Sequence, residues 1–312
     1  MGKGGMNKKL VRPEGSWVAL VTPFDARGEV DMGCFRRLVD FHVASGTDGL
    51  IFMGSTGESP SLCMEERQAI IAEMSAYCRG KIPAFHGVTC STTAATTELA
   101  RFSEAQGADG VMMVVPPYLA PPQKSIFEFF KTVCQSIQIA VALYNNPARV
   151  SVNINPDTII KLAAECPNLV ADKEAVPSAG QLVSVLEGTQ GKLQLLCCDA
   201  PNYAIIIPTL ALGGHGTANV AGNVIPREMA QMSRPWKSWQ DVWQSRKVYF
   251  ENLPVMEASY SHTNPVAIKA MVKLLGFPVG EPRPPLPSLS AQQMRPLEEL
   301  LSRLKIRERY EL

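Results

Sequence analysis

Short apolar runs alternate with longer amphipathic stretches along the chain, up to about residue 224. Each run is a few residues long and is bounded by Gly, Pro, Asp or Asn, which is typical of a strand buried on both faces. The predicted strands are residues 17–21, 49–53, 84–88, 110–115, 139–144, 169–173, 193–197 and 216–220.

The stretches between these runs repeat their apolar positions at helical spacing. In residues 31–44, for example, Phe35, Leu38, Val39 and His42 fall on one face. The predicted helices are residues 31–44, 63–77, 92–106, 123–137, 156–166, 177–186 and 202–212.

This order of elements predicts a TIM barrel, an α/β fold of eight strand–helix units. Two helix-to-strand turns echo one another, Gly46-Thr47-Asp48-Gly49 and Gly107-Ala108-Asp109-Gly110. A doubly wound sheet is the weaker alternative, because no Gly-x-Gly-x-x-Gly loop follows Val21 to bind a phosphate.

After Val224 the pattern changes to a C-terminal helical extension. Residues 239–252, 265–275 and 291–305 have helical patterns. The Pro-rich segment 278–287 lies between the last two and cannot be helical, so it predicts an extended strap.

Composition indicates a globular protein that acts on a small molecule. Of the 312 residues 46% are hydrophobic and 19% charged, and the net charge is +1. These values exclude general disorder and provide no field that would attract nucleic acid or a membrane surface. We expect a basic, disordered lead-in at 1–15 without the apolar core of a signal peptide, a barrel core at 16–224 and C-terminal helices at 225–312 packed on the barrel.

The eight cysteines are spread along the chain without a Cys-x-x-Cys pair, which predicts reduced thiols and a cytoplasmic protein. The four histidines lack metal-ligand spacing, so we expect no metal, and a metal-dependent class II aldolase is poorly supported. His42, on a helix face, and His86, in a strand, are predicted to be structural. A serine hydrolase is poorly supported too, because no Gly-x-Ser-x-Gly elbow is present.

Reacting groups in such a barrel lie at the C-terminal ends of the strands. Gly54-Ser55-Thr56-Gly57-Glu58 follows the second predicted strand and offers backbone N–H groups and two hydroxyls. This combination suits a small carboxylate. The same residues also suit an ordinary tight turn with capping hydroxyls.

Tyr144 ends the fifth predicted strand, and Arg149 follows it. Together they can relay a proton and clamp a carboxylate, although interfacial packing and a solvated loop charge would explain them as well. Lys173 ends the sixth predicted strand. Burial lowers the pKa of an amine and lets it attack a ketone, whereas an ion pair with Asp172 or Glu174 is the structural alternative.

In combination these clusters resemble the dihydrodipicolinate synthase / N-acetylneuraminate lyase family of class I, Schiff-base-forming lyases. The strand-end motifs of the resemblance are Gly54-Ser-Thr-Gly-Glu58, Tyr144-Asn-x-Pro-x-Arg149 and Lys173-Glu174. Further matches are Ala19-Leu-Val-Thr-Pro-Phe24, Pro117-Tyr118, Gly213-Gly-x-Gly-Thr217 and Asn264-Pro-x-x-x-Lys269. The resemblance covers nearly the whole chain and is more specific for the family than for the substrate.

The resemblance implies a homotetramer that needs no cofactor. Lys173 would form the imine with pyruvate or another 2-oxo acid, and Ser55 and Thr56 would hold its carboxylate. Tyr144 would carry protons to and from the carbinolamine and the aldol oxygen. Tyr118 would reach into a neighbouring subunit's site and complete the relay with Ser55 and Tyr144. The other expected pocket residues are Gly54, Cys198 and Ala218.

Arg149 favours the synthase branch, in which the matching arginine binds the carboxylate of aspartate semialdehyde. Ser55 points the other way, because synthases usually have Thr there and neuraminate lyases Ser. Cys198 stands where a glycine usually borders the imine site, and Asp172 replaces an apolar residue. Strand alternation predicts that the side chain of Asp172 points away from the barrel interior.

We therefore expect a dihydrodipicolinate synthase-like lyase that condenses pyruvate with a carboxylate-bearing aldehyde such as aspartate semialdehyde. One alternative is an aldolase or dehydratase of a 2-keto-3-deoxy sugar acid or another hydroxylated 2-oxo acid. Another is a 2-oxo acid sensor without turnover, which the departures at Cys198 and Asp172 motivate. Pro117, Met64 and Arg67 differ from residues common in lysine-inhibited synthases, which argues against feedback inhibition by lysine.

Overall fold

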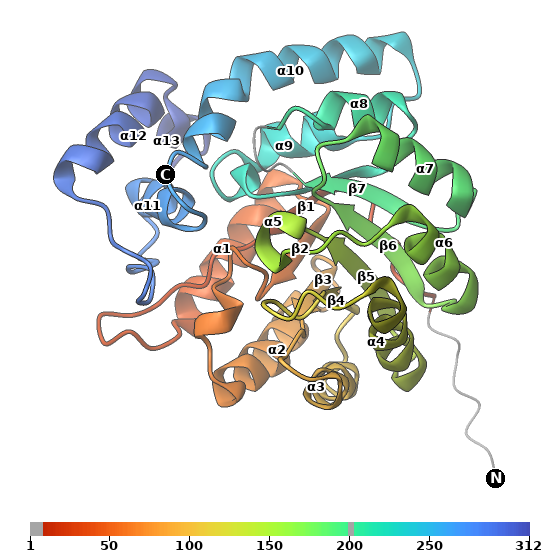
Figure 1. Cartoon of the computed structure of the whole chain (residues 1–312). Helices are drawn as coiled ribbons and strands as arrows, with labels where there is room; N and C mark the ends of the chain where they lie inside the picture. Colours follow the sequence, from red (N-terminus) through yellow and green to blue (C-terminus); the bar gives the residue numbers. More distant parts are fainter. Residues whose placement is uncertain (1–8, 199–202) are drawn as a thin grey trace.

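A computed structural model describes residues 9–198 and 203–312. Within these residues eight parallel strands close into a barrel, each paired with the next along the chain and β8 paired with β1 (Figure 1). The strands are β1 (Gly15–Ala19), β2 (Gly49–Phe52), β3 (Ala84–Gly87), β4 (Gly110–Val114), β5 (Ala140–Asn145), β6 (Leu169–Glu174), β7 (Gln194–Cys198) and β8 (Gly216–Asn219). The predicted TIM barrel is confirmed.

Helices lie between the strands along the chain, and most of them surround the barrel (Figure 1). They are α1 (Met32–Ser45), α2 (Met64–Cys78), α3 (Thr93–Ala105), α4 (Gln123–Ser136), α5 (Pro147–Val150), α6 (Pro156–Glu165), α7 (Ala179–Thr189) and α8 (Ile206–Ala211). Local signals set their ends: α1 begins after Asp31, which accepts a hydrogen bond from the backbone N–H of Cys34 (2.8 Å), and it ends at Gly46 with a left-handed φ of 76°. The predicted helix at 202–212 begins only at Ile206, and residue 202 lies outside the described residues.

The C-terminal region is helical, as predicted, and α11–α13 gather beside α1 (Figure 1). Its helices are α9 (Pro226–Ser233), α10 (Trp239–Ala258), α11 (Val266–Leu274), α12 (Ala291–Arg303) and α13 (Ile306–Arg309). The ring of Phe41 in α1 lies 5.2 Å from each of the rings of Phe277 and Tyr310, which ties the end of the chain to the barrel. We did not predict α9 or α13, which are both short.

Aromatic rings fill the barrel interior at its N-terminal end. Trp17 and Phe85 meet edge to face, with ring centroids 4.8 Å apart. Gly49 makes room for them, because a Cβ atom there would lie 2.4 Å from the Trp17 ring. Leu10 and Val11 pack against the same cluster, so residues 9–15 differ from the disordered lead-in that we expected. Strand β1 starts at Gly15, two residues before the predicted start, because Gly15 pairs with Gly216 of β8.

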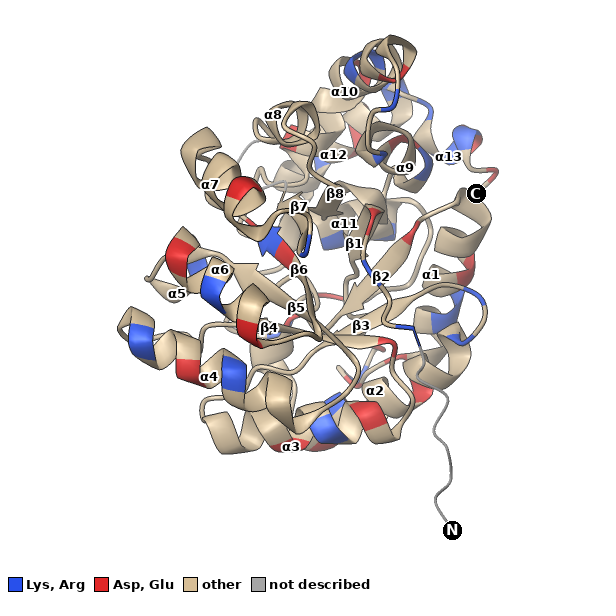
Figure 2. Cartoon of the chain, turned by 90° about the vertical axis from the view of Figure 1, so that its right-hand side faces the viewer, with Lys and Arg blue, Asp and Glu red and all other residues tan. Residues whose placement is uncertain are grey.

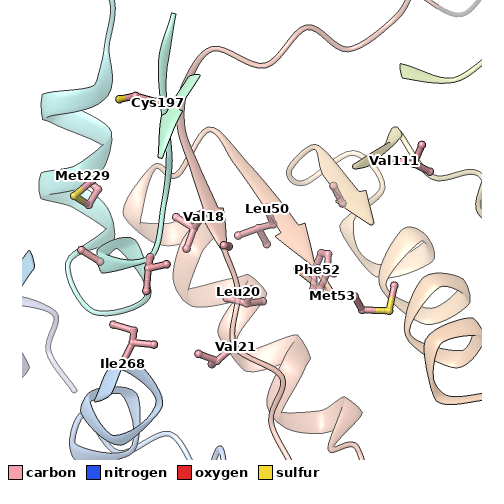
Figure 3. Close-up of a cluster of buried hydrophobic side chains, with 14 of the residues drawn as sticks. Val18, Leu20, Val21, Leu50, Phe52, Met53, Val111, Cys197, Met229 and Ile268 are labelled. Atoms are coloured by element: carbon pink, nitrogen blue, oxygen red, sulfur yellow. The ribbon is translucent and has the colours of Figure 1, made fainter. Parts of the chain in front are cut away.

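A second apolar layer lies between the strands and the surrounding helices. Figure 3 shows Val18, Leu20 and Val21 of the β1 segment in this layer, with Met229 of α9 and Ile268 of α11. The C-terminal helices thus share one core with the barrel. Burial of this apolar surface stabilises both parts together.

Acidic and basic residues are interspersed over the described helices (Figure 2), which agrees with the near-zero net charge. None of the described helices is both long enough and apolar enough to cross a membrane.

Asp172 is an acid in the apolar layer. It lies on the outer face of β6, in register with Leu143 of β5 and Leu195 of β7, as alternation predicted. Its side chain is fully buried, and neither carboxylate oxygen has a hydrogen-bond partner among the described residues. Burial, and then the nearby charge of Glu174, raise the pKa of Asp172 well above its usual range.

This raised pKa predicts that Asp172 weakens the fold as the pH increases. An unfolded Asp titrates near pH 4, whereas the folded group stays protonated to higher pH. The contribution of Asp172 to the free energy of unfolding is therefore greatest below pH 4 and falls above it, by up to about 1.4 kcal/mol per pH unit, until the folded group ionises. In urea unfolding between pH 5 and pH 7, Asp172→Asn should lose less stability than the wild type. The exposed Asp157→Asn is the control. Identical pH dependence in the wild type and Asp172→Asn would contradict this explanation.

Candidate active site

A small cavity lies at the C-terminal ends of the barrel strands, under the loop that follows α10. It joins residues from β5, β6 and β7 to the loops after β2 and β8 and to the C-terminal region. The described residues that line it are Ser55, Thr56, Tyr144, Asn146, Arg149, Lys173, Cys198, Val220, Tyr260 and Asn264.

Lys173 and Tyr144 are neighbours in this cavity. They are in register on β6 and β5, both side chains are buried, and the Lys173 ammonium lies 4.3 Å from the centroid of the Tyr144 ring. The Tyr144 hydroxyl accepts a hydrogen bond from Asn146 Nδ2 (2.6 Å) and lies 3.9 Å from Cys198 Sγ. An amine and a phenol therefore meet at one point, where a substrate carbonyl can be attacked and protonated.

The acids beside Lys173 occupy the opposite face of β6. Glu174 is fully buried and accepts hydrogen bonds from Asn145 Nδ2, from Gln181 Nε2 and from the backbone N–H of Val176. Burial raises the pKa of Glu174 to about 7, and these hydrogen bonds oppose the rise. Because neither Glu174 nor Asp172 faces the cavity, the ion pair that would make Lys173 purely structural is not formed.

The loop after β2 presents Ser55 and Thr56 to the cavity. Its path depends on Gly57, where a Cβ atom would lie 2.9 Å from the backbone nitrogen of Met53. Thr22 donates a hydrogen bond to the carbonyl of Gly57 (2.6 Å). From the C-terminal region, Asn264 Nδ2 donates to the Thr56 hydroxyl (3.0 Å). The loop is thus fixed from both sides.

Glu58 anchors the same loop through a buried ion pair. Its Oε1 lies 2.7 Å from Nζ of Lys269 in α11, and both side chains have no exposed surface. The other carboxylate oxygen accepts the backbone N–H of Arg283 (2.8 Å) in the Pro-rich strap. The Lys269 ammonium also lies 4.0 Å from the centroid of the Phe24 ring. Burial lowers the pKa of Lys269, and the Glu58 carboxylate opposes this.

The remaining predicted residues lie at different distances from the cavity. Arg149 and Cys198 line it, and Arg149 donates weakly to the carbonyl of Asn264 (3.4 Å). Gly54 and Ala218 are buried beside it but are not among the residues that line it. Tyr118 follows β4 with 96% of its surface exposed and lies outside the cavity of its own chain.

Three polar residues of the cavity were not predicted from the sequence. Asn146 occupies an unspecified position of the strand-five motif, and Asn264 was noted only as part of a C-terminal match. Tyr260 comes from the turn after α10 and carried no signal in the sequence. Thr56 and Asn264 are more than 200 positions apart in the sequence. Their contact depends on the tertiary fold, and local sequence patterns do not reveal it.

His42 and His86 are structural, as predicted. His42 Nδ1 lies 2.9 Å from the Thr47 hydroxyl, and His86 Nε2 lies 3.0 Å from the Ser75 hydroxyl. Both rings are fully buried, and burial lowers the pKa of each to about 3. They therefore stay neutral over the physiological pH range.

Comparison with known proteins decides the family. The model of the dihydrodipicolinate synthetase family matches residues 12–304. This chain belongs to that family. It is therefore an aldolase-type lyase of class I, related to dihydrodipicolinate synthase, and the resemblance inferred from the motifs is confirmed.

Individual relatives agree with the family assignment. The 4-hydroxy-tetrahydrodipicolinate synthase of Aquifex aeolicus is 34% identical over 94% of this chain and 98% of its own length. A crystal structure of the dihydrodipicolinate synthase from that organism superposes with a TM-score of 0.89 and the same coverage. The chloride-inhibited enzyme from Acinetobacter baumannii, solved in complex with pyruvate, is 28% identical with a TM-score of 0.88, over 94% of this chain and 99% of its own.

The buried pair predicts that removing one charge alone is costly. Lys269→Met leaves Glu58 uncompensated and should reduce the free energy of unfolding by about 3–5 kcal/mol in urea titrations. Lys273→Met is the control, because Lys273 and its partner Glu281 are half exposed and should contribute at most about 1 kcal/mol.

The double variant Glu58→Gln/Lys269→Met should be more stable than Lys269→Met, since no unpaired charge remains. If Lys269→Met is as stable as the control Lys273→Met, the ion pair between Glu58 and Lys269 does not stabilise the loop.

Proposed function

We propose that this protein forms a Schiff base between Lys173 and pyruvate and condenses the bound pyruvate with an aldehyde that carries a carboxylate. The observation that carries the proposal is the buried Lys173 amine beside the Tyr144 phenol, with the neighbouring acids turned to the other face of β6. The relatives named 4-hydroxy-tetrahydrodipicolinate synthase and the neighbour solved with pyruvate support it.

In the proposed reaction the Lys173 amine attacks the ketone carbon of pyruvate. The carbonyl oxygen leaves as water after proton transfers, and the protonated imine draws electrons from the adjacent methyl carbon. That carbon loses a proton, and the enamine attacks the aldehyde carbon. Tyr144 is placed to supply a proton to the departing hydroxyl and to the new alkoxide.

We assign the pyruvate carboxylate to the loop of Ser55 and Thr56. Both of these hydroxyl-bearing residues line the cavity, and hydrogen bonds are strong when the acceptor is charged. The anchoring of this loop by Asn264 and by Glu58 supports a fixed binding geometry, which a reaction between oriented groups requires.

We assign the carboxylate of the second substrate to Arg149, at the exposed edge of the cavity. A guanidinium binds a carboxylate through two parallel hydrogen bonds. Aspartate semialdehyde carries such a carboxylate. Among 2-oxo acid reactions, this arginine therefore favours the synthase reaction over cleavage or dehydration of a sugar acid.

We further propose a homotetramer in which Tyr118 completes the site of a neighbouring subunit. A tyrosine with 96% of its surface exposed, beside the exposed Leu119, is unusual in an isolated chain and suits an interface. A cytoplasmic location is part of the proposal, because all eight cysteines are thiols rather than disulfides.

Borohydride reduction in the presence of pyruvate should attach one reduced pyruvate to Lys173. Intact mass and peptide mapping measure this adduct. Lys173→Met should give none, while Lys161→Met, at an exposed lysine of α6, should behave as the wild type. A folded wild-type protein without an adduct would contradict the proposed chemistry.

Arg149→Ala should weaken binding of the aldehyde without affecting the reaction with pyruvate. We expect the KM for aspartate semialdehyde to rise about 10- to 100-fold, because hydrogen bonds to a charged group are lost, while the yield of the pyruvate adduct stays unchanged. Arg101→Ala, at an exposed arginine of α3, is the control. If aldehyde binding and adduct formation fall together, the role assigned to Arg149 is wrong.

A further inference from the structure

Asn146 contacts the reacting phenol, although the strand-five motif leaves its position unspecified. Its side chain is buried, with 6% of its surface exposed, and Nδ2 donates a hydrogen bond to the Tyr144 hydroxyl at 2.6 Å. Its backbone is fixed as well, because its carbonyl accepts the N–H groups of Arg149 (3.0 Å) and Val150 (3.2 Å) at the start of α5. The amide is therefore held against the phenol by a rigid turn.

The direction of this hydrogen bond has a chemical consequence. An amide NH2 group can only donate, so the phenol oxygen is the acceptor and its own proton is directed away from Asn146. When Tyr144 gives that proton to a substrate oxygen, the O–H bond breaks and the electron pair stays on Oη. A donor aimed at Oη stabilises this phenolate more than the neutral phenol.

We propose that Asn146 is a positioning residue for Tyr144. Its amide fixes the phenol oxygen as a hydrogen-bond acceptor and stabilises the phenolate that forms when Tyr144 gives up its proton. This role rests on the proposed function, since the relay serves the imine at Lys173. The hydrogen bond itself can be tested without any substrate.

Other titratable groups border the same phenol. Lys173 lies over its ring from β6, Cys198 Sγ faces its hydroxyl from β7, and Arg149 and Tyr260 line the cavity. A titration must therefore be assigned to Tyr144 directly. Labelling the tyrosines with carbon-13 at Cζ gives a signal for each phenol, and Tyr144→Phe identifies the one that belongs to Tyr144.

The first measurement is the titration of this signal in three proteins. Asn146→Leu removes the donor and should raise the titration midpoint of Tyr144 by about one pH unit. Asn146→Asp places a negative charge there and should raise it further. Asn155→Leu, at an exposed asparagine near the start of α6, should leave it unchanged. Equal midpoints in the wild type, Asn146→Leu and Asn146→Asp overturn the proposal.

The second measurement is the rate at which pyruvate becomes trapped on Lys173 by borohydride. Asn146→Leu should slow trapping about tenfold, and Asn146→Asp should slow it more. In the Tyr144→Phe background Asn146→Leu should change the rate less than twofold, because the group it positions is gone. An equal effect in both backgrounds would mean that Asn146 only supports the fold, which overturns the proposal.

The two measurements separate this proposal from the proposed function. A shifted Tyr144 titration without any pyruvate adduct in the wild type would keep the hydrogen-bond role of Asn146 and overturn the Schiff-base chemistry. An adduct in the wild type, together with no shift in the Tyr144 titration on substitution of Asn146, would support the Schiff-base chemistry and overturn the role of Asn146.

Discussion

The site depends on one buried ion pair, between Glu58 in the loop after β2 and Lys269 in α11. Neither side chain has exposed surface, so each charge is tolerated only because the other lies 2.7 Å away. The pair fixes α11 and the Pro-rich strap against the loop that presents Ser55 and Thr56. The C-terminal helices therefore help to hold the active site in place, although Lys173 and Tyr144 both come from barrel strands.

On strands β5 and β6, the residues that line the cavity and the residues that support the fold lie on opposite faces. Tyr144 and Lys173 point into the cavity, while their chain neighbours Asn145 and Glu174 bond to one another on the outer face. This separation places the buried Glu174 next to Lys173 in β6 without an ion pair between the two side chains. Strand alternation accounts for the separation, and it requires both strands to keep their register.

Much of this arrangement could be predicted from sequence because it is local. Apolar runs identified the eight strands. The lysine at the end of the sixth run was a candidate nucleophile, but an ion pair explained it as well, and only the family resemblance proposed Lys173 as the Schiff-base lysine. The start of β1 was misplaced because pairing with β8, and not apolarity, determines it. Asn264 and Tyr260 reach the cavity only through the packing of distant helices, and the role of Asn146 depends on the turn at α5, so local patterns did not assign them to the site.

The central claim is that one cavity holds a 2-oxo acid with its ketone carbon on Lys173 and its carboxylate on the Ser55–Thr56 loop. A crystal structure of the protein with pyruvate tests it most directly. The account predicts continuous electron density from Lys173 Nζ to pyruvate, with the carboxylate at that loop and the former ketone carbon beside the Tyr144 hydroxyl. Pyruvate bound without a bond to Lys173, or with its carboxylate on Arg149, would contradict it.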